Sequence, residues 1–205
     1  MDVLNTANIA EVLRLLRVRL LPVKGPLPYV DSIEGPLPDA RRAAVLIPVF
    51  ELHGETHLAF IRRASTLRSH GGEIAFPGGK AEYGESFPVI TALREAQEEI
   101  GLAPTSIEVL GLLPPVFTVV SNYLITPVVA YLPSGLGTLK LQSSEVTEVI
   151  LASLRRLSDP AIAHTEQWSR AGKVRTVYFY TYGAHQIWGA TGRILAAFLE
   201  LLSSP

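Results

Sequence analysis

Residues 78–102 carry the side chains of this sequence that are best suited to chemistry. The run opens on Gly78 and Gly79 and closes on a helical stretch that contains Glu95, Glu98 and Glu99. Residues three and four apart share one face of a helix, so we expect these three carboxylates to converge. Like charges at such distances repel one another unless a cation lies among them. Because Mg²⁺ prefers oxygen ligands and bridges to substrate phosphates, the stretch predicts metal-assisted chemistry on a phosphate.

Two neighbouring residues favour a built site over the alternative of a solvated acidic helix face. Arg94 directly precedes the carboxylates, and Glu85 lies in the glycine-rich turn before the helix. The fork geometry of an arginine–carboxylate pair would brace the turn against the helix. Ile100 and Gly101 then end the helix with an apolar anchor and a residue that tolerates a left-handed backbone. The combination favours a metal site.

The segment just upstream, residues 62–77, is basic where the helix is acidic. It contains Arg62, Arg63, Arg68 and His70, followed by two glycines. Phosphates are held by guanidinium groups and by the exposed backbone N–H groups of glycine-rich loops. Ordinary surface charges at a strand end are the alternative interpretation. Beside the acidic helix we favour phosphate contacts by Arg63, Arg68 and His70, and Arg62 is the weaker candidate.

The spacing of these residues resembles the signature of the Nudix hydrolases. That signature runs glycine, five residues, glutamate, seven residues, then Arg-Glu-apolar-any-Glu-Glu-any-Gly-apolar. The matching positions are Gly79, Glu85, Arg94, Glu95, Ala96, Glu98, Glu99, Gly101 and Leu102. Here eight residues, rather than seven, separate the first glutamate from the arginine, and alanine stands where a larger apolar residue is usual. The resemblance implies a pyrophosphohydrolase with an α/β fold, an α/β/α sandwich around a mixed sheet.

Residues 67–79, LRSHGGEIAFPGG, resemble a motif of one branch of that family, the coenzyme A pyrophosphatases. The branch also tends to carry the longer interval seen here, and it usually has glutamine where Glu73 stands. Residues 187–191, IWGAT, resemble the branch again. The resemblance implies hydrolysis of coenzyme A or its thioesters to a phosphopantetheine fragment and adenosine 3′,5′-bisphosphate.

The resemblance also implies roles for individual residues. The metal ligands, for Mg²⁺ or Mn²⁺, would be Glu95, Glu98 and Glu99. The catalytic set adds Arg94 and, from outside the signature, Glu145, for which a surface carboxylate is the alternative. The proton acceptor could be Glu98, Glu99 or Glu145. The substrate-binding residues would be Arg63, Arg68, His70, Gly78 and Gly79.

Two other functions stay open, because the residues by themselves predict only metal-dependent cleavage of a phosphoanhydride. The first is a hydrolase of ADP-ribose, a dinucleotide or a nucleoside triphosphate. The second is a module with the Nudix fold that binds a nucleotide without cleaving it. A binding module has no need of three converging carboxylates, so we prefer an enzyme acting on a small diphosphate.

The composition fits one packed domain with an appended arm. The 205 residues are 48% hydrophobic and 18% charged, with a net charge of −1 and no cysteine. No disulfide or thiol nucleophile is therefore possible, and no nucleic-acid partner is expected. The sequence has neither a signal-peptide pattern nor an apolar run of about twenty residues. We expect a soluble, cytoplasmic protein without a membrane partner.

The elements that must position these residues divide into an arm and a domain. Residues 1–39 are expected to form an N-terminal helix over 6–21 and a proline- and glycine-rich arm over 22–39, and residues 40–205 the Nudix domain. The helix would dock on its own domain or on a partner, so a homodimer is possible. Strands are expected over 43–52, 56–61, 106–113, 123–132 and 174–182, helices over 150–159 and 192–202, and a loop over 164–173.

Overall fold

The computed structural model describes residues 8–25, 39–67, 69–170 and 172–203. Its α-helices are α2 (Ile9–Arg19), α3 (Val89–Ile100), α4 (Leu154–Leu157) and α5 (Gly189–Ser203), and short 3₁₀ helices cover Pro104–Ser106 and Pro160–Ile162. Its strands are β1 (Arg41–Leu52), β2 (Glu55–Arg63), β3 (Ile74–Ala75), β4 (Gly78–Lys80), β5 (Glu108–Leu112), β6 (Val116–Thr118), β7 (Tyr123–Tyr131), β8 (Val146–Ser153), β9 (Ala163–Arg170), β10 (Lys173–Tyr182) and β11 (His185–Trp188).

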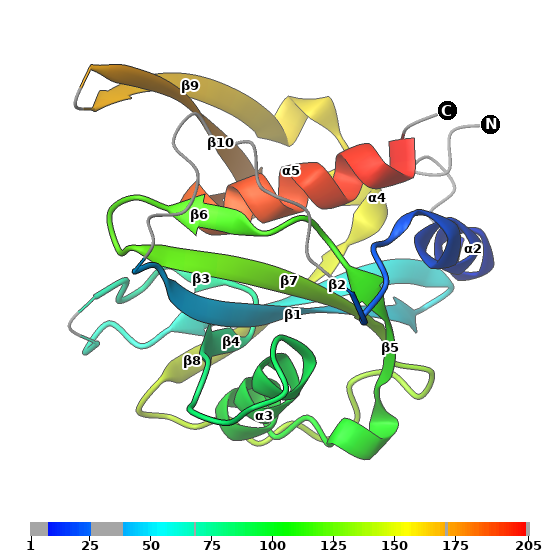
Figure 1. Ribbon diagram of the computed structural model, residues 1–205. Helices are drawn as coiled ribbons and strands as arrows, with labels where there is room; N and C mark the ends of the chain where they lie inside the picture. The colour runs from blue at the N-terminus through cyan, green and yellow to red at the C-terminus, as the bar shows by residue number, and fades with distance from the viewer. Residues whose placement is uncertain (1–7, 26–38, 68, 171, 204–205) are drawn as a thin grey trace.

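The larger sheet has eight strands and is mixed. Strand β1 pairs in parallel with β7 and antiparallel with β2 and β4, and β8 pairs with the other edge of β2. Helix α3 packs against β1 and β4, whereas α2 and α5 lie on the opposite side (Figure 1). This is the predicted α/β sandwich with a mixed sheet, and it explains why β1 reads as an almost continuous apolar run: both of its faces are covered.

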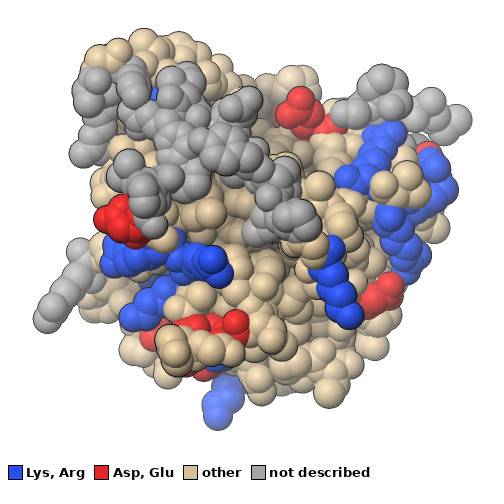
Figure 2. All heavy atoms as spheres, viewed as in Figure 1, with Lys and Arg blue, Asp and Glu red and all other residues tan. Residues whose placement is uncertain are grey.

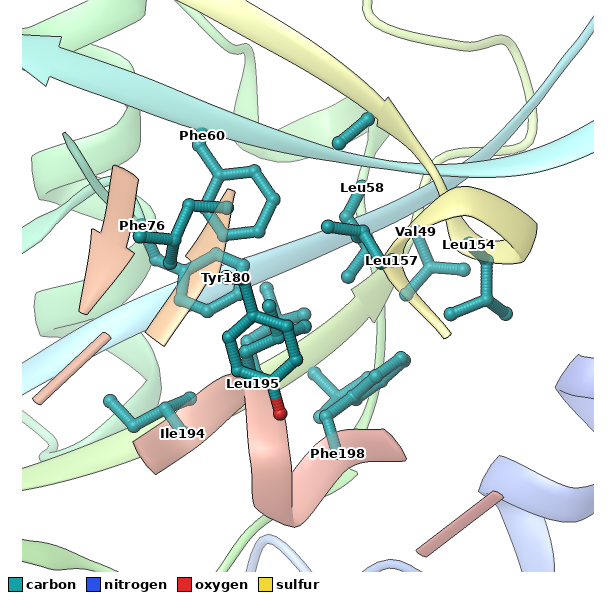
Figure 3. Close-up of a cluster of buried hydrophobic side chains, with 14 of the residues drawn as sticks. Val49, Leu58, Phe60, Phe76, Leu154, Leu157, Tyr180, Ile194, Leu195 and Phe198 are labelled. Carbon is teal, nitrogen blue, oxygen red and sulfur yellow. The ribbon is translucent and has the colours of Figure 1, made fainter. Parts of the chain in front are cut away.

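Alternate residues of β1 enter two separate cores. Ile47 and Val49 face the core shared with α2 and α5, whereas Leu46 and Phe50 face the core shared with α3. Such alternation follows from the two-residue period of a strand. In the first core Phe60 and Phe76 stack with ring centroids 4.4 Å apart, near Tyr180 of β10 and Phe198 of α5 (Figure 3). The second core contains the buried face of α3, the helix that carries the three carboxylates.

Helix α2 docks on its own domain, as one of the two predicted arrangements. Asn8 caps it, because the Asn8 side chain accepts a hydrogen bond of 2.9 Å from the backbone N–H of Ala10. Arg17 bonds Glu108 at 3.0 Å, and Arg19 donates to the carbonyl of Leu201 in α5 at 2.8 Å. Most of the predicted arm, residues 26–38, lies outside the described residues.

A second sheet of three antiparallel strands, in the order β11-β10-β9, corrects two sequence predictions. Residues 164–173 are not a loop, because most of them form β9. Residues 150–159 are helical only over Leu154–Leu157, and the stretch before them continues strand β8. On one face of the small sheet the rings of His164, Phe179 and Trp188 stack in a row, with centroid distances of 4.9 and 6.0 Å.

The described helices include none that is long and apolar enough to cross a membrane. On the face shown in Figure 2, lysine and arginine side chains lie in separate groups, with acidic side chains beside several of them. That distribution agrees with a net charge of −1 and gives this face no continuous basic surface.

Candidate active site

Two adjacent glycines let strand β4 pass closely between β1 and α3. A Cβ atom on Gly78 would lie 2.4 Å from the carbonyl oxygen of Ala44 in β1. A Cβ atom on Gly79 would lie 2.4 Å from the carboxylate of Glu95 in α3. The contact at Gly78 is with backbone that cannot move, so only glycine fits there, whereas a side chain at position 79 would force the Glu95 carboxylate to turn away. The sequence therefore needs the double glycine to bring backbone N–H groups up to the carboxylates of α3.

Glu99 is the most buried charged side chain of the site, with 1% of its surface exposed. It follows Ala92 and Ala96 along the buried stripe of α3, which aims its carboxylate at the sheet. The backbone N–H of Gly78 donates to Glu99 Oε2 at 2.9 Å, and Arg63 Nη1 lies 3.6 Å from Glu99 Oε1. Burial raises the pKa of Glu99 to about 7, against the lowering influence of the Gly78 hydrogen bond and the Arg63 charge.

Two neighbouring carboxylates, those of Glu95 and Glu145, repel the carboxylate of Glu99. Burial also raises the pKa of Glu95, and the charge of Glu145 acts in the same direction on both Glu95 and Glu99. Glu145 is exposed and stands just before β8, where its carbonyl accepts a hydrogen bond of 2.8 Å from the Ala64 N–H. Arg94 beside Glu95 and Arg63 beside Glu99 offset only part of this negative charge, because Glu145 adds a third carboxylate. Such an excess of negative charge favours a divalent cation.

Arg94 joins the glycine turn to the helix, and the predicted pair with Glu85 is present. Arg94 Nε lies 2.6 Å from Glu85 Oε1, and Arg94 Nη2 donates to the carbonyl of Lys80 at 3.1 Å. The hydroxyl of Thr91 donates to the other oxygen of Glu85 at 2.7 Å. The hydrogen bonds that Glu85 accepts, of which that from Arg94 has the largest effect, hold its pKa at about 2. Helix α3 begins at Val89, after Pro88.

The three helix carboxylates do not form one preformed group, contrary to the expectation that they converge. Arg94 Nη1 holds Glu95 at 2.9 Å and Glu98 at 3.0 Å, and 59% of the Glu98 side chain is exposed. Across the described ranges, no three histidine or acidic side chains already stand where they could hold a metal ion together. The reason is the position of Arg94, one turn before Glu98, which favours an ion pair along the helix.

The three predicted phosphate-binding residues of segment 62–77 differ in where the structure places them. Arg63 reaches the buried carboxylate of Glu99, as described above. The Nδ1 atom of His70 lies 3.0 Å from Glu73 Oε2 in an exposed part of the loop. Arg68 is outside the described residues. The geometry thus brings Arg63 to the carboxylates and leaves the roles of His70 and Arg68 as predictions.

Comparison with known proteins agrees with this geometry. The family profile described as the NUDIX domain matches residues 40–173. The chain belongs to the Nudix family. A Nudix hydrolase named NudL from Photorhabdus laumondii is 41% identical over 155 residues, which cover 76% of this chain and 81% of the relative. A NudL protein of Salmonella paratyphi B is 37% identical over the same length, with 76% and 79% covered.

A solved structure supports the Nudix fold over nearly the whole chain. The MutT/nudix family protein of Enterococcus faecalis superposes with a TM-score of 0.50 at 15% identity, covering 96% of this chain and 70% of that one. Together with the family match, the relatives identify the protein as a pyrophosphohydrolase of the Nudix family. Nudix hydrolases generally use divalent metal ions, and the excess of carboxylate charge around Glu99 fits that requirement.

The structure adds site residues of this Nudix domain to which the sequence gave little or no weight. A bulge interrupts the pairing of β2 with β8 between Arg62 and Arg63. An open pocket of about 460 Å³ lies there, lined by Arg62, Arg63, Ser65, Gly72, Thr147 and Glu148. The paired arginines are a sequence signal for this pocket. Thr147 and Glu148 of its opposite wall lie in β8, a strand that the sequence does not predict, because a helix is expected over 150–159.

The two glycines provide a matched test of the Nudix site. We expect Gly78→Ala to destabilise the protein by about 2 to 3 kcal/mol, because its Cβ would strike the backbone of β1. Gly79→Ala should change stability little, because its Cβ meets the end of the Glu95 side chain, which can turn away. It should instead weaken metal affinity by about tenfold or more. Thermal melts in EDTA and calorimetric titration with Mn²⁺ separate the two effects, and equal melting losses would contradict the assignment.

Proposed function

We propose that the protein hydrolyses coenzyme A or its thioesters at the diphosphate bridge, in a reaction that depends on Mg²⁺ or Mn²⁺. The observation that carries the chemistry is the carboxylate of Glu99, buried beside Gly78 and Arg63 and repelled by two neighbouring carboxylates. The coenzyme A assignment is supported by the resemblance of residues 67–79 to that branch of the Nudix family. The reaction yields a phosphopantetheine fragment and adenosine 3′,5′-bisphosphate.

Each side chain has a distinct part in this proposal. Glu95 and Glu99 would hold the cation, and Glu98 would join them after leaving Arg94. When bound, the cation offsets charge on the phosphate oxygens and lowers the pKa of a water molecule. The guanidinium of Arg63 orients the phosphate that is attacked. Arg94 keeps the helix and the glycine turn in register through its contacts with Glu85 and Lys80.

The proton of the attacking water needs a carboxylate that is not already engaged. Glu98 is paired with Arg94, and Glu99 accepts from Gly78. Glu145 influences the pKa values of Glu95 and Glu99 and is exposed at the start of β8. These observations favour Glu145 as the proton acceptor over Glu98 and Glu99. As the proton moves to it, water oxygen bonds to phosphorus and the bond to the other phosphate breaks.

One incubation tests the proposed function. The protein is mixed with coenzyme A and Mg²⁺, and the products are resolved by chromatography. We expect adenosine 3′,5′-bisphosphate, and we expect it to vanish when EDTA replaces the metal. Turnover of ADP-ribose or a dinucleotide without turnover of coenzyme A would keep the Nudix chemistry and reject the substrate. Tight nucleotide binding without any turnover would identify a binding module.

We also propose, as a separate hypothesis, that the protein forms a homodimer. The apolar side chains of α2 that suggested it, including Val12 and Leu16, are buried in the helix's own domain. Val18 of the same helix is 77% exposed and is the side chain through which a partner would be reached. Light scattering at micromolar concentration tests the idea, and a monomer mass would reject it.

A further inference from the structure

The pocket beside the bulge of β2 has a lining suited to an anion. Two guanidinium groups, of Arg62 and Arg63, and the hydroxyl of Ser65 line it, while the Thr147 hydroxyl, also in the lining, donates to the carbonyl of Arg62 at 3.3 Å. Adjacent Cα atoms are about 3.8 Å apart, and the bulge between the two arginines allows both side chains to enter the same pocket instead of opposite faces. Guanidinium groups bind phosphate through two parallel hydrogen bonds. The pocket therefore fits a phosphate group.

The pocket shares one residue, Arg63, with the Nudix site. Arg63 lines it and also reaches Glu99, with 3.6 Å between Nη1 and Oε1. The Nε atom of Arg63 is buried and has no hydrogen-bond partner among the described residues. Arg63 thus belongs both to the pocket and to the site where the diphosphate is cleaved, and the preceding residue, Arg62, lines the pocket as well.

Arg62 is held only loosely and can turn to a ligand. Its Nη1 atom lies 3.8 Å from Glu148 Oε2, and both side chains are nearly half exposed. Exposed ion pairs of this length are weak. The other oxygen of Glu148 lies 3.6 Å from His185 Nε2, and 44% of the Glu148 side chain is exposed, so water can solvate this carboxylate when Arg62 leaves. A phosphate can replace Glu148 at Arg62 without leaving that carboxylate isolated.

We propose that this pocket binds a second phosphate of the substrate, a phosphomonoester on the ribose of the nucleoside whose 5′-diphosphate is cleaved. The inference rests on the proposed function, since it assigns the pocket to the same substrate. Arg62 recognises the monoester, Arg63 lies between it and the diphosphate, and Glu148 competes with it for Arg62. The protein then selects ribose-phosphorylated diphosphates over their dephosphorylated counterparts.

Two pairs of substrates test the selection and locate the phosphate. Coenzyme A is compared with 3′-dephospho-coenzyme A, and NADPH, which carries a 2′-phosphate, with NADH. We expect kcat/KM to favour the phosphorylated member of one pair by about tenfold or more, the effect of one hydrogen-bonded charge pair. The pair that shows the preference identifies the ribose position. Equal kcat/KM values within both pairs would overturn the proposal.

Two variants that should change KM in opposite directions test the roles of Arg62 and Glu148. Arg62→Gln should remove the preference by raising KM for the phosphorylated substrate alone. Glu148→Gln should lower that KM, because it removes the competing charge. Arg17→Gln, an equally exposed arginine paired with Glu108 on the far side of the sheet, is the control and should change neither. Equal losses on both members of a pair in Arg62→Gln would place Arg62 at the diphosphate or in the fold.

A binding experiment separates this inference from the proposed function. Adenosine 3′,5′-bisphosphate and AMP are titrated calorimetrically into the parent protein and Arg62→Gln, with adenosine 2′,5′-bisphosphate as the other isomer. Tighter binding of either bisphosphate by the parent, lost in the variant, supports the pocket even if no diphosphate is cleaved. Binding of both bisphosphates no tighter than that of AMP would reject the pocket even if coenzyme A is cleaved.

Discussion

Glu99→Gln is expected to be nearly inactive with Mg²⁺ and yet more stable than the parent protein in EDTA at pH 8. Removing a charge that helps to hold the cation should lower kcat by about 10³-fold, since a catalytic metal contributes several kcal/mol to the transition state. The gain in stability has the same origin, because Glu99 is buried and its carboxylate is repelled by Glu95 and Glu145. Glutamine keeps an oxygen that can accept the Gly78 hydrogen bond.

The pH dependence of this effect has a definite sign. The pKa of Glu99 is about 7 in the folded protein and 4.5 as its ordinary value. The proton that the folded state binds more tightly stabilises it fully below pH 4.5, and this contribution is lost as the pH rises through 7. The interval corresponds to about 3 kcal/mol of unfolding free energy at most. Glu99→Gln should therefore match the parent near pH 4 and exceed it above pH 7.

Urea unfolding in EDTA at several pH values measures the difference. Glu98→Gln is the matched control, because 59% of its side chain is exposed, and its stability should change by less than about 0.5 kcal/mol. A Glu99→Gln protein that is less stable than the parent at pH 8 would contradict the inference that the ionised Glu99 carboxylate destabilises the fold. Addition of Mg²⁺ should stabilise the parent and leave the variant unchanged, because ligand binding stabilises only the form that binds.

Arg94→Met is expected to damage both fold and function. Arg94 contacts Glu85, Glu95, Glu98 and the carbonyl of Lys80, and Glu85 is only 11% exposed. Loss of the guanidinium leaves buried carboxylates without their partner, which should cost about 3 kcal/mol of unfolding free energy. Turnover should fall as well, because the glycine turn and α3 are no longer held together.

Glu85 supplies an independent signature of the same contact. Its pKa is held near 2, below the ordinary 4.5, so its contribution to stability is present above pH 4.5 and is lost as the pH falls toward 2. The parent should lose stability in that interval, and Arg94→Met should lose less of it. Arg94→Lys keeps the charge without the fork and should restore stability only in part. A variant within about 0.5 kcal/mol of the parent would show that Arg94 is not a structural brace.

The chemistry of the site was easier to predict from sequence than its exact arrangement. The double glycine follows from the need for close backbone approach, and the Glu85–Arg94 pair follows from the spacing of the turn and the helix. The capture of Glu98 by Arg94 does not, because the same spacing is compatible with a carboxylate facing a metal or an arginine. That choice depends on how the side chain of Arg94 divides its donors among neighbours.

The fold shows the same division between clear and ambiguous patterns. Strand β1 was predicted because its apolar run is long and bounded by a turn. Strand β8 was not, because leucines at 151, 154 and 157 follow a helical spacing. In the structure Leu151 points outward and is 40% exposed, while Val146, Ile150 and Ala152 face the cores. Proline within a sheet is usually confined to an edge strand or a bulge. Strand β7 nevertheless lies inside the sheet, because Pro127 falls at the break between its neighbours β6 and β5.

The aromatic row of the small sheet also determines what an optical experiment on this protein reports. The chain has two tryptophans, and both belong to this cluster: Trp168 lies 5.9 Å from Trp188 and 6.1 Å from Phe179, measured between ring centroids. Intrinsic tryptophan fluorescence therefore follows the packing of β9, β10 and β11 and is remote from α3. Circular dichroism follows the backbone of the whole chain. Coincident fluorescence and dichroism transitions would show that the small sheet unfolds cooperatively with the larger sheet. A fluorescence transition at lower temperature would show that the small sheet unfolds first, as a separate unit.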